Sequence, residues 1–198
     1  MDRIVLATRN AHKVLEVQRI FADAGVPVEI LGTEAFSDLP DIAETGSTFA
    51  QNALLKARAV SAHTGLPAMA DDSGLCVDAL NGMPGIFSAR WSGAHGDDVA
   101  NLNLLLGQLA DVPDQRRGAS FHCAAALVTP AGIERICEGV LDGRIIREPR
   151  GTNGFGYDPI FVPHSHDITT AEMSPEAKDA ISHRGQAFRA LADAIRSQ

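Results

Sequence analysis

The sequence predicts an α/β protein, because short apolar runs alternate along its 198 residues with longer segments of helical periodicity. A hydrophobic content of 45% is typical of a soluble globular protein, and a chain of this length can bury a substantial core. The sequence contains no internal repeat, low-complexity tract or linker. We therefore expect one domain over residues 1–198.

The acidic balance of the chain limits the partners that it can bind. A net charge of -8 argues against nucleic-acid polymers and membrane surfaces as partners, because both require a basic face. No apolar run approaches the roughly 18 to 20 residues of a membrane span, and the N-terminus lacks a signal-peptide pattern. The three cysteines lie far apart and form no CxxC pair, which favours a reducing compartment. We expect a cytoplasmic protein.

The first two elements are a strand at Ile4–Ala7 and a helix that starts at Asn10 and stops at Gly25. Lys13 falls in the first turn of this helix, although the positive end of a helix dipole prefers anions. A bound anion, held by free backbone amides and by Lys13, would remove this conflict. The alternative is a solvated surface lysine.

A second strand is expected at Val28–Leu31, followed by an irregular acidic connection and a second long helix. Thr48 and Gln51 form a capping box, so this helix should begin near Thr48 and run to about Ala62. Asn52 and Lys56 lie four residues apart on it, where they can share one ligand or remain solvated. Glu44 lies just ahead of the helix, where its carboxylate can turn toward a metal.

The stretch Leu66–Asp78 carries the strongest chemical signal in the sequence. An apolar run leads into Asp71, Asp72 and Ser73-Gly74, and a second apolar run follows, which predicts a strand, a sharp acidic turn and another strand. Adjacent carboxylates repel one another, and Mg2+ bound through their oxygens and through substrate phosphates would relieve that cost. The alternative is a turn in which both carboxylates cap backbone amides.

The second half of the chain contains further predicted elements. Asp97 or Asp98 should start a helix whose leucine stripe belongs to the core, and two alternating runs at 119–129 and 133–140 predict an antiparallel hairpin. Ser174-Pro175 should start a short helix that carries Lys178, and the final helix follows His183-Arg184.

The loop Gly151–Pro159 holds two aromatic residues among glycines, with a carboxylate close by. Its spacing is that of neither a Walker loop nor a dinucleotide-binding fingerprint. An exposed Phe155 would suit stacking on a nucleobase. The alternative is a loop side chain that plugs the core.

The order of these motifs resembles that of the inosine triphosphate pyrophosphatase family, the Ham1-like enzymes that act on non-canonical purine nucleoside triphosphates. The likeness extends from Leu6 to Gly185 and is carried by Thr8–Lys13, Glu44–Gly46 with Phe49, Asn52 and Lys56, Ala70–Leu75, Pro84–Arg90, Gly154–Pro159, Lys178 and Ser182–Gly185.

This resemblance implies a Mg2+-dependent hydrolase that converts ITP, dITP or XTP to the nucleoside monophosphate and pyrophosphate, removing deaminated purines from the nucleotide pool. It also implies a homodimer of chains with an elongated, two-lobed α/β fold. In that fold a long mixed sheet is flanked by helices, and the active cleft lies between the lobes.

The resemblance also assigns roles to residues. Glu44 and Asp72 would face the metal, and Asp72 would accept the proton. The residues that would bind substrate are Thr8, Arg9, Asn10, Ala11, His12, Lys13, Lys56, Ser73, Phe155, Gly156, Tyr157, Asp158, Lys178, His183 and Arg184.

Two other functions remain open from the sequence. A Maf-type nucleoside triphosphate pyrophosphatase would share the acidic site and differ in its base pocket, so a panel of substrates separates the two. A nucleotide-binding module without hydrolysis would release no pyrophosphate with or without Mg2+.

Overall fold

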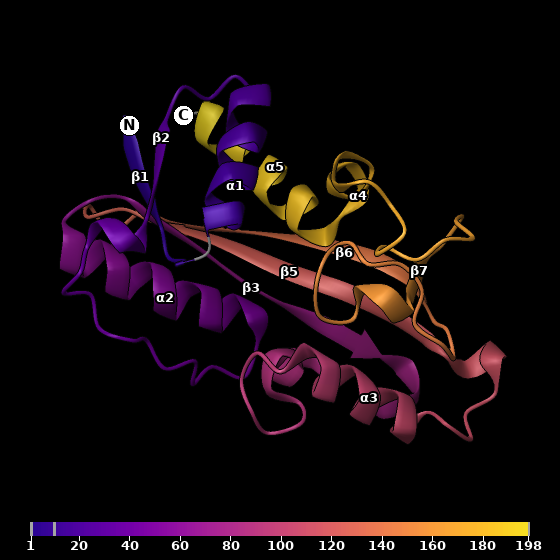
Figure 1. Ribbon diagram of the computed structural model, residues 1–198. Coiled ribbons are helices and arrows are strands. Elements are labelled where there is room, and N and C mark those ends of the chain that lie inside the picture. The colour runs from indigo at the N-terminus through magenta and orange to yellow at the C-terminus, as the bar shows by residue number, and fades with distance from the viewer. Residues whose placement is uncertain (1, 10, 198) are drawn as a thin grey trace. The chain divides into compact units, whose positions relative to one another are not determined.

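The computed structural model describes residues 2–9 and 11–197, without the side chains of Ala11 and His12 (Figure 1). The helices are α1 (Ala11–Asp23), α2 (Phe49–Thr64), α3 (Asp98–Gln108), α4 (Pro175–Ile181) and α5 (His183–Arg196). The strands are β1 (Arg3–Leu6), β2 (Glu29–Gly32), β3 (Ala68–Val77), β4 (Met83–Pro84), β5 (Gly118–Val128), β6 (Glu134–Ile145) and β7 (Phe161–Pro163). Along the described chain, no helix has both the length and the apolar character needed to cross a membrane.

The strands of the described chain form one mixed sheet in the order β2-β1-β3-β5-β6-β7, and β4 pairs with β3 outside this path. β1 is parallel to both β2 and β3, whereas the β3–β4 and β6–β7 pairs are antiparallel. The predicted α/β class with a long mixed sheet flanked by helices is confirmed.

The chain divides into two compact units, each with its own core. Unit 1 comprises residues 1–72, 123–139 and 184–198, and unit 2 comprises residues 73–122 and 140–183. The single domain and the cleft expected from the sequence stay predictions.

Unit 1 has three layers, with α1 and α5 on one face of its strands and α2 on the other (Figure 1). Alternation along β5 produces this arrangement, because successive side chains of a strand point to opposite faces. Cys123 and Ala125 pack in the core cluster of α1 and α5, whereas Ala124 and Ala126 pack with α2. The predicted cap of α2 is confirmed, since the Thr48 side chain accepts a hydrogen bond from the backbone N–H of Gln51.

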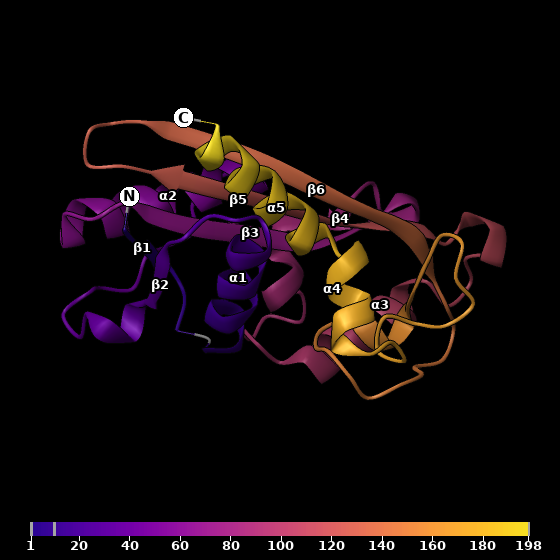
Figure 2. The same ribbon diagram turned by 90° about the horizontal axis from the view of Figure 1, so that it is seen from above.

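Unit 2 includes α3 and α4 (Figure 2), and side chains of α3 contribute to its core. Leu102, Leu105 and Leu109 of α3 pack with Phe121 of β5 and Ile145 of β6, so the predicted leucine stripe does belong to the core. The helix begins after Asp97, whose side chain caps it, in agreement with one of the two predicted starts.

The predicted acidic turn is wrong. β3 runs without interruption from Ala68 to Val77, and Asp71 and Asp72 lie in its interior. The reason is that strand geometry itself separates the two carboxylates, because neighbouring residues of a strand face opposite sides of the sheet. The chain therefore does not need a bend to relieve their repulsion.

Candidate functional site

The first candidate site lies in unit 1, where β3 extends past the end of β1. The pairing of these parallel strands stops at Leu6 opposite Met69, so the following residues of β3 continue beyond their neighbour. β1 lies between β2 and β3, with α1 and α2 on opposite faces of the unit. In open α/β sheets, ligands bind at the carboxyl ends of strands where the connections diverge in this way.

Asp71 faces the side of the sheet that α1 and α5 cover. Its carboxylate accepts from Lys13 Nζ at 3.2 and 3.3 Å and from Arg184 Nε at 3.1 Å. Burial alone would raise the pKa of Asp71, but the charges of Lys13 and Arg184 outweigh it and hold that pKa well below its usual range. The anion expected beside Lys13 at the start of α1 is therefore supplied, at least in part, by the protein itself.

Asp72 faces the opposite side, which α2 covers. Its Oδ2 accepts a hydrogen bond of 3.0 Å from Asn52 Nδ2, and Lys56 Nζ lies 3.7 Å from its Oδ1. Lys56 Nζ also donates to Glu44 Oε1 at 2.7 Å, so two carboxylates converge on one ammonium. Burial raises the pKa of Asp72, although Lys56 and the hydrogen bond from Asn52 act against this rise.

Asn52 also fixes the segment that carries Glu44. Its Oδ1 accepts a hydrogen bond of 2.8 Å from the backbone N–H of Gly46. A Cβ at Gly46 would lie 2.7 Å from that oxygen, so only glycine allows the segment to approach so closely. One buried amide thus holds both Asp72 and the backbone two residues after Glu44.

The donor set of Glu44 and Asp72 fits a hard divalent cation, because both side chains offer carboxylate oxygens and already converge on one positive charge. Within the described residues, no group of three or more His, Cys, Asp and Glu side chains could hold a metal ion. Two protein carboxylates completed by substrate phosphates and water are the usual way in which Mg2+ binds at phosphate-transfer sites.

The loop between β1 and α1 lies at the same end of unit 1. Thr33 donates to the carbonyl oxygen of Thr8 through both its N–H and its hydroxyl, at 3.0 and 2.9 Å. Arg9 pairs with Asp41 at 3.0 Å on the surface, and both line a pocket of about 200 Å3 that Lys56 also lines. Asn10 and the side chains of Ala11 and His12, also predicted to bind substrate, lie outside the described residues.

The second candidate site lies in unit 2, on the loop that carries Phe155. Phe155 is 55% exposed, and Lys178 Nζ lies 5.3 Å from the centroid of its ring. Asp158, by contrast, is 3% exposed and accepts from Phe155 N at 2.8 Å, from Thr170 Oγ1 at 2.8 Å and from Lys178 Nζ. Asp158 therefore joins the loop to Lys178 through its buried carboxylate, whereas the side chain of Phe155 is exposed.

Other predicted substrate residues of unit 2 serve as anchors in the structure. The buried Tyr157 hydroxyl donates to the carbonyl oxygen of Ser88 at 2.9 Å, and burial raises its pKa. Gly156 N donates to Asp98 Oδ2 at 2.9 Å. His183 stacks on Phe121 with ring centroids 4.9 Å apart, and Ser73 is half-buried in β3. Their contacts with substrate stay predictions.

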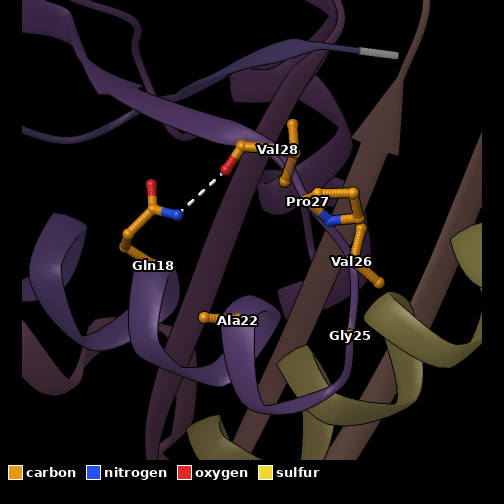
Figure 3. A pocket seen from close by; sticks show the side chains of 6 residues that line it. All are labelled: Gln18, Ala22, Gly25, Val26, Pro27 and Val28. Carbon is orange, nitrogen blue, oxygen red and sulfur yellow. Dashed lines mark hydrogen bonds between the residues drawn. The ribbon is translucent and has the colours of Figure 1, made fainter.

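A separate pocket of about 380 Å3 lies between α1 and the segment that leads into β2 (Figure 3). Its lining is Gln18, Ala22, Gly25, Val26, Pro27 and Val28, and Gln18 donates to the carbonyl oxygen of Val28 at 2.9 Å. Because this lining includes no charged side chain, we assign no chemistry to it.

The pairing of Asp71 with Lys13 and Arg184 was not predicted from the sequence, and the sharing of a ligand by Asn52 and Lys56 was one of two alternatives. A signal for both was present. If Leu66–Asp78 is interpreted as one strand, its alternation assigns Asp71 and Asp72 to different faces, and each must then find cations on different helices.

Comparisons with known proteins show which family this chain resembles. The model of the Ham1 family matches residues 4–194. The dITP/XTP pyrophosphatase of Streptomyces coelicolor is 60% identical over 196 residues, which cover 99% of this chain and 98% of that protein. The dITP/XTP pyrophosphatase of Cutibacterium acnes is 59% identical over 197 residues, which cover 98% of this chain and 97% of that protein.

Two solved structures have a fold similar to that of this chain. A HAM1 protein from Coxiella burnetii matches with a TM-score of 0.92 and 47% identity over 100% of both chains. A nucleoside-triphosphatase / dITP/XTP pyrophosphatase from Mycobacterium abscessus matches with a TM-score of 0.81 and 55% identity over 97% of both chains.

Proposed function

This chain belongs to the Ham1 family, and on that premise we propose that it hydrolyses non-canonical purine nucleoside triphosphates. The substrates are dITP, ITP and XTP, and the products are the nucleoside monophosphate and pyrophosphate. Its activity would remove deaminated purines from the nucleotide pool. Relatives with 60% identity over nearly the full chain are dITP/XTP pyrophosphatases, which supports this choice over a Maf-type enzyme or a non-hydrolytic module.

The observation that carries the proposal is the convergence of Glu44 and Asp72 on Lys56. Hydrolysis at the α-phosphorus adds negative charge to oxygens that already repel one another, so the catalyst must mainly position groups and stabilise charge. A site with a base, a second carboxylate and an ammonium within hydrogen-bonding or ion-pair distance offers these functions in one place.

Asp72 is the proton acceptor in this proposal. Its pKa, raised by burial, makes the carboxylate a stronger base than an exposed aspartate. The hydrogen bond that Asn52 Nδ2 donates to Asp72 Oδ2 fixes the orientation of the carboxylate. Asp72 can then take the proton of a water molecule that attacks the α-phosphorus.

Glu44 and Asp72 would hold the Mg2+ ion that we propose as the cofactor. When bound, this ion would neutralise phosphate oxygens and lower the pKa of water. Lys56 and Lys13 would bind further phosphate oxygens, and the half-exposed loop of Thr8 and Arg9 would contribute to the same group. Before any ligand binds, the formal charges of the cluster cancel, with Lys13, Lys56 and Arg184 opposed by Glu44, Asp71 and Asp72.

Base selection is the proposed task of Phe155, Lys178, His183 and Arg184. The exposed Phe155 ring would stack on the purine, and Lys178 beside it would contribute a positive charge. A 6-keto oxygen accepts hydrogen bonds from such cationic donors, whereas the 6-amino group of adenine would bring two donors together. A site of this kind rejects the mismatched base strongly, because its polar groups are left unpaired.

The direct test offers dITP, XTP, dATP and dGTP to the purified protein with and without Mg2+, and measures pyrophosphate and orthophosphate separately. We expect Mg2+-dependent release of pyrophosphate from dITP and XTP. Release of orthophosphate, or equal rates with dATP, would contradict the proposal, and substrate binding without any release would support the module without hydrolysis.

We also propose a cytoplasmic homodimer. The cysteines Cys76, Cys123 and Cys137 are free, as expected in a reducing compartment. The dimer rests on the family resemblance, and light scattering of the full chain at micromolar concentration tests it. A mass of one chain under those conditions would exclude the dimer.

A further inference from the structure

We propose that Asp71 is a positioning residue. Its buried carboxylate pairs with both Lys13 and Arg184, and it thereby couples the binding of the substrate phosphates to the selection of the base. The inference rests on the proposed function, since it takes Lys13 as a phosphate contact and Arg184 as a base contact. Asp71 itself touches neither the metal nor the reacting atoms in this proposal.

The face of β3 on which Asp71 lies excludes it from the metal site. Met69 packs in the core cluster of α1 and α5, and Asp71, two residues later, faces the same side. Ala70 packs with α2, and Asp72 faces that side with Glu44, Asn52 and Lys56. The metal proposed for Glu44 and Asp72 therefore lies across the strand from Asp71.

Three separate elements meet at the Asp71 carboxylate. Lys13 lies in the first turn of α1, Arg184 in the first turn of α5, and Asp71 in β3. Both cations lie at the helix end whose dipole disfavours positive charge, so each requires an anion there. Oδ2 serves both cations, at 3.2 Å from Lys13 Nζ and 3.1 Å from Arg184 Nε.

The three side chains that meet here are largely removed from water. The side chains of Asp71 and Arg184 are 4% and 9% exposed, and that of Lys13 is 24% exposed. Without the carboxylate, two like charges would face each other with little water to screen them, and both would move. A change at one cation is thus transmitted to the other through their shared anion.

The test replaces Asp71 with asparagine, which keeps the shape of the side chain and removes its charge. Inorganic tripolyphosphate carries no base, so its inhibition constant as a competitive inhibitor measures phosphate binding alone. The ratio of kcat/KM for dITP to that for dATP reports base selection. We expect Asp71→Asn to raise the inhibition constant of tripolyphosphate and to lower the dITP preference together, each by about tenfold, as for the loss of a hydrogen bond to a charged group.

Gln18→Met supplies the matched control. Gln18 lies on α1, five residues after Lys13, and joins α1 to β2 through hydrogen bonds of 2.9 and 2.8 Å to Val28 O and from Ile30 N. Its loss should lower the melting temperature while both kinetic measures stay unchanged. Loss of stability alone would therefore be distinguishable from the coupling that we propose.

A second measurement keeps the inference testable if Asp71→Asn does not fold. Arg184→Met removes the competition of Arg184 for the Asp71 carboxylate, so Asp71 should hold Lys13 more tightly. The inhibition constant of tripolyphosphate should then rise about threefold although Arg184 is assigned to the base. An unchanged constant there, or an Asp71→Asn protein that alters only one of the two measures, would overturn the inference. If the wild-type protein hydrolyses neither dITP nor XTP, the proposed function fails, and this inference fails with it.

Discussion

Unit 1 and unit 2 hold their functional side chains in different ways. In unit 1, Asp71 and Asp72 lie in a strand, and the cations that face them come from long helices. In unit 2, the exposed Phe155 lies on a loop that is held by the buried carboxylate of Asp158 and by hydrogen bonds of Gly156 and Tyr157. The difference teaches that unit 1 fixes charged groups, which suits the chemical step that we propose, whereas unit 2 exposes an aromatic ring, which suits the proposed stacking on a base. Changes of Asp72 and Lys56 in unit 1 should reduce kcat, and a change of Phe155 in unit 2 should raise KM.

The largest effect should follow from Asp72→Asn in unit 1. The amide keeps the size of the side chain but cannot take a proton, so kcat for dITP should fall about a thousandfold. Pyrophosphate release measures the rate, and circular dichroism tests the fold. Asp38→Asn is the control, because Asp38 is an exposed partner of His63 in the same unit. A folded Asp72→Asn protein with the wild-type rate would remove Asp72 from the mechanism.

The next effect should follow from Lys56→Met. The variant keeps an apolar stem but removes the ammonium on which Glu44 and Asp72 converge, so kcat should fall about a hundredfold. Arg58→Met on the same helix is the control, since Arg58 pairs with Glu134 at the surface. If Lys56→Met raises KM and leaves kcat unchanged, Lys56 contributes only to binding, and the proposed contrast between the units weakens.

A smaller effect is expected from Phe155→Ala in unit 2. Loss of a stacking ring should raise KM for dITP about ten- to hundredfold and leave kcat nearly unchanged. Phe87→Ala is the control, because Phe87 is also an exposed ring of unit 2 beside a cation, Arg90. The stacking role would be lost if both variants gave the wild-type KM.

The smallest effect should appear in the pH profile of Asn52→Leu. Burial is the main cause that raises the pKa of Asp72, and the hydrogen bond from Asn52 lowers it. Loss of that hydrogen bond raises the pKa further, and Asp72 acts as an ionised base. The acidic limb of kcat against pH should therefore move to higher pH.

Asn101→Leu provides the control for this profile. Asn101 is a buried amide of unit 2 that binds Ser92 N and Ala89 O, so its loss should reduce stability without moving the acidic limb. A limb that stays in place in Asn52→Leu would show that Asn52 does not tune Asp72.

Much of the fold could be predicted from local patterns in the sequence. The Thr48 cap, the leucine stripe of α3 and the Ser174 cap of α4 depend on neighbours within a few residues, and all three are confirmed. The acidic turn was predicted wrongly, because a carboxylate pair interrupts an apolar run in the sequence whether or not the backbone bends. The strand continues because its alternation places the two carboxylates on opposite faces, where cations of α1, α2 and α5 pair with them.

The site was less predictable, because its contacts join distant segments. Asp71 and Arg184 are 113 residues apart, and Phe121 and His183 also meet only in the fold. Tyr157 and Asp158 lie two and three residues after Phe155 in the sequence, yet both side chains turn inward to anchor the loop. Sequence resemblance can identify such a segment, but it cannot tell which of its members face the solvent.

Because side chains of β3 alternate between two faces, the site depends on the number of residues that precede Asp71 in the strand. Inserting or deleting a single residue just before Asp71 would exchange the two acids, so that each would meet the helix meant for the other. Adding two residues would restore the faces and only displace the acids along the strand. We therefore expect the site to tolerate insertions or deletions of two residues in this strand better than those of one residue, although both acids are present in either case.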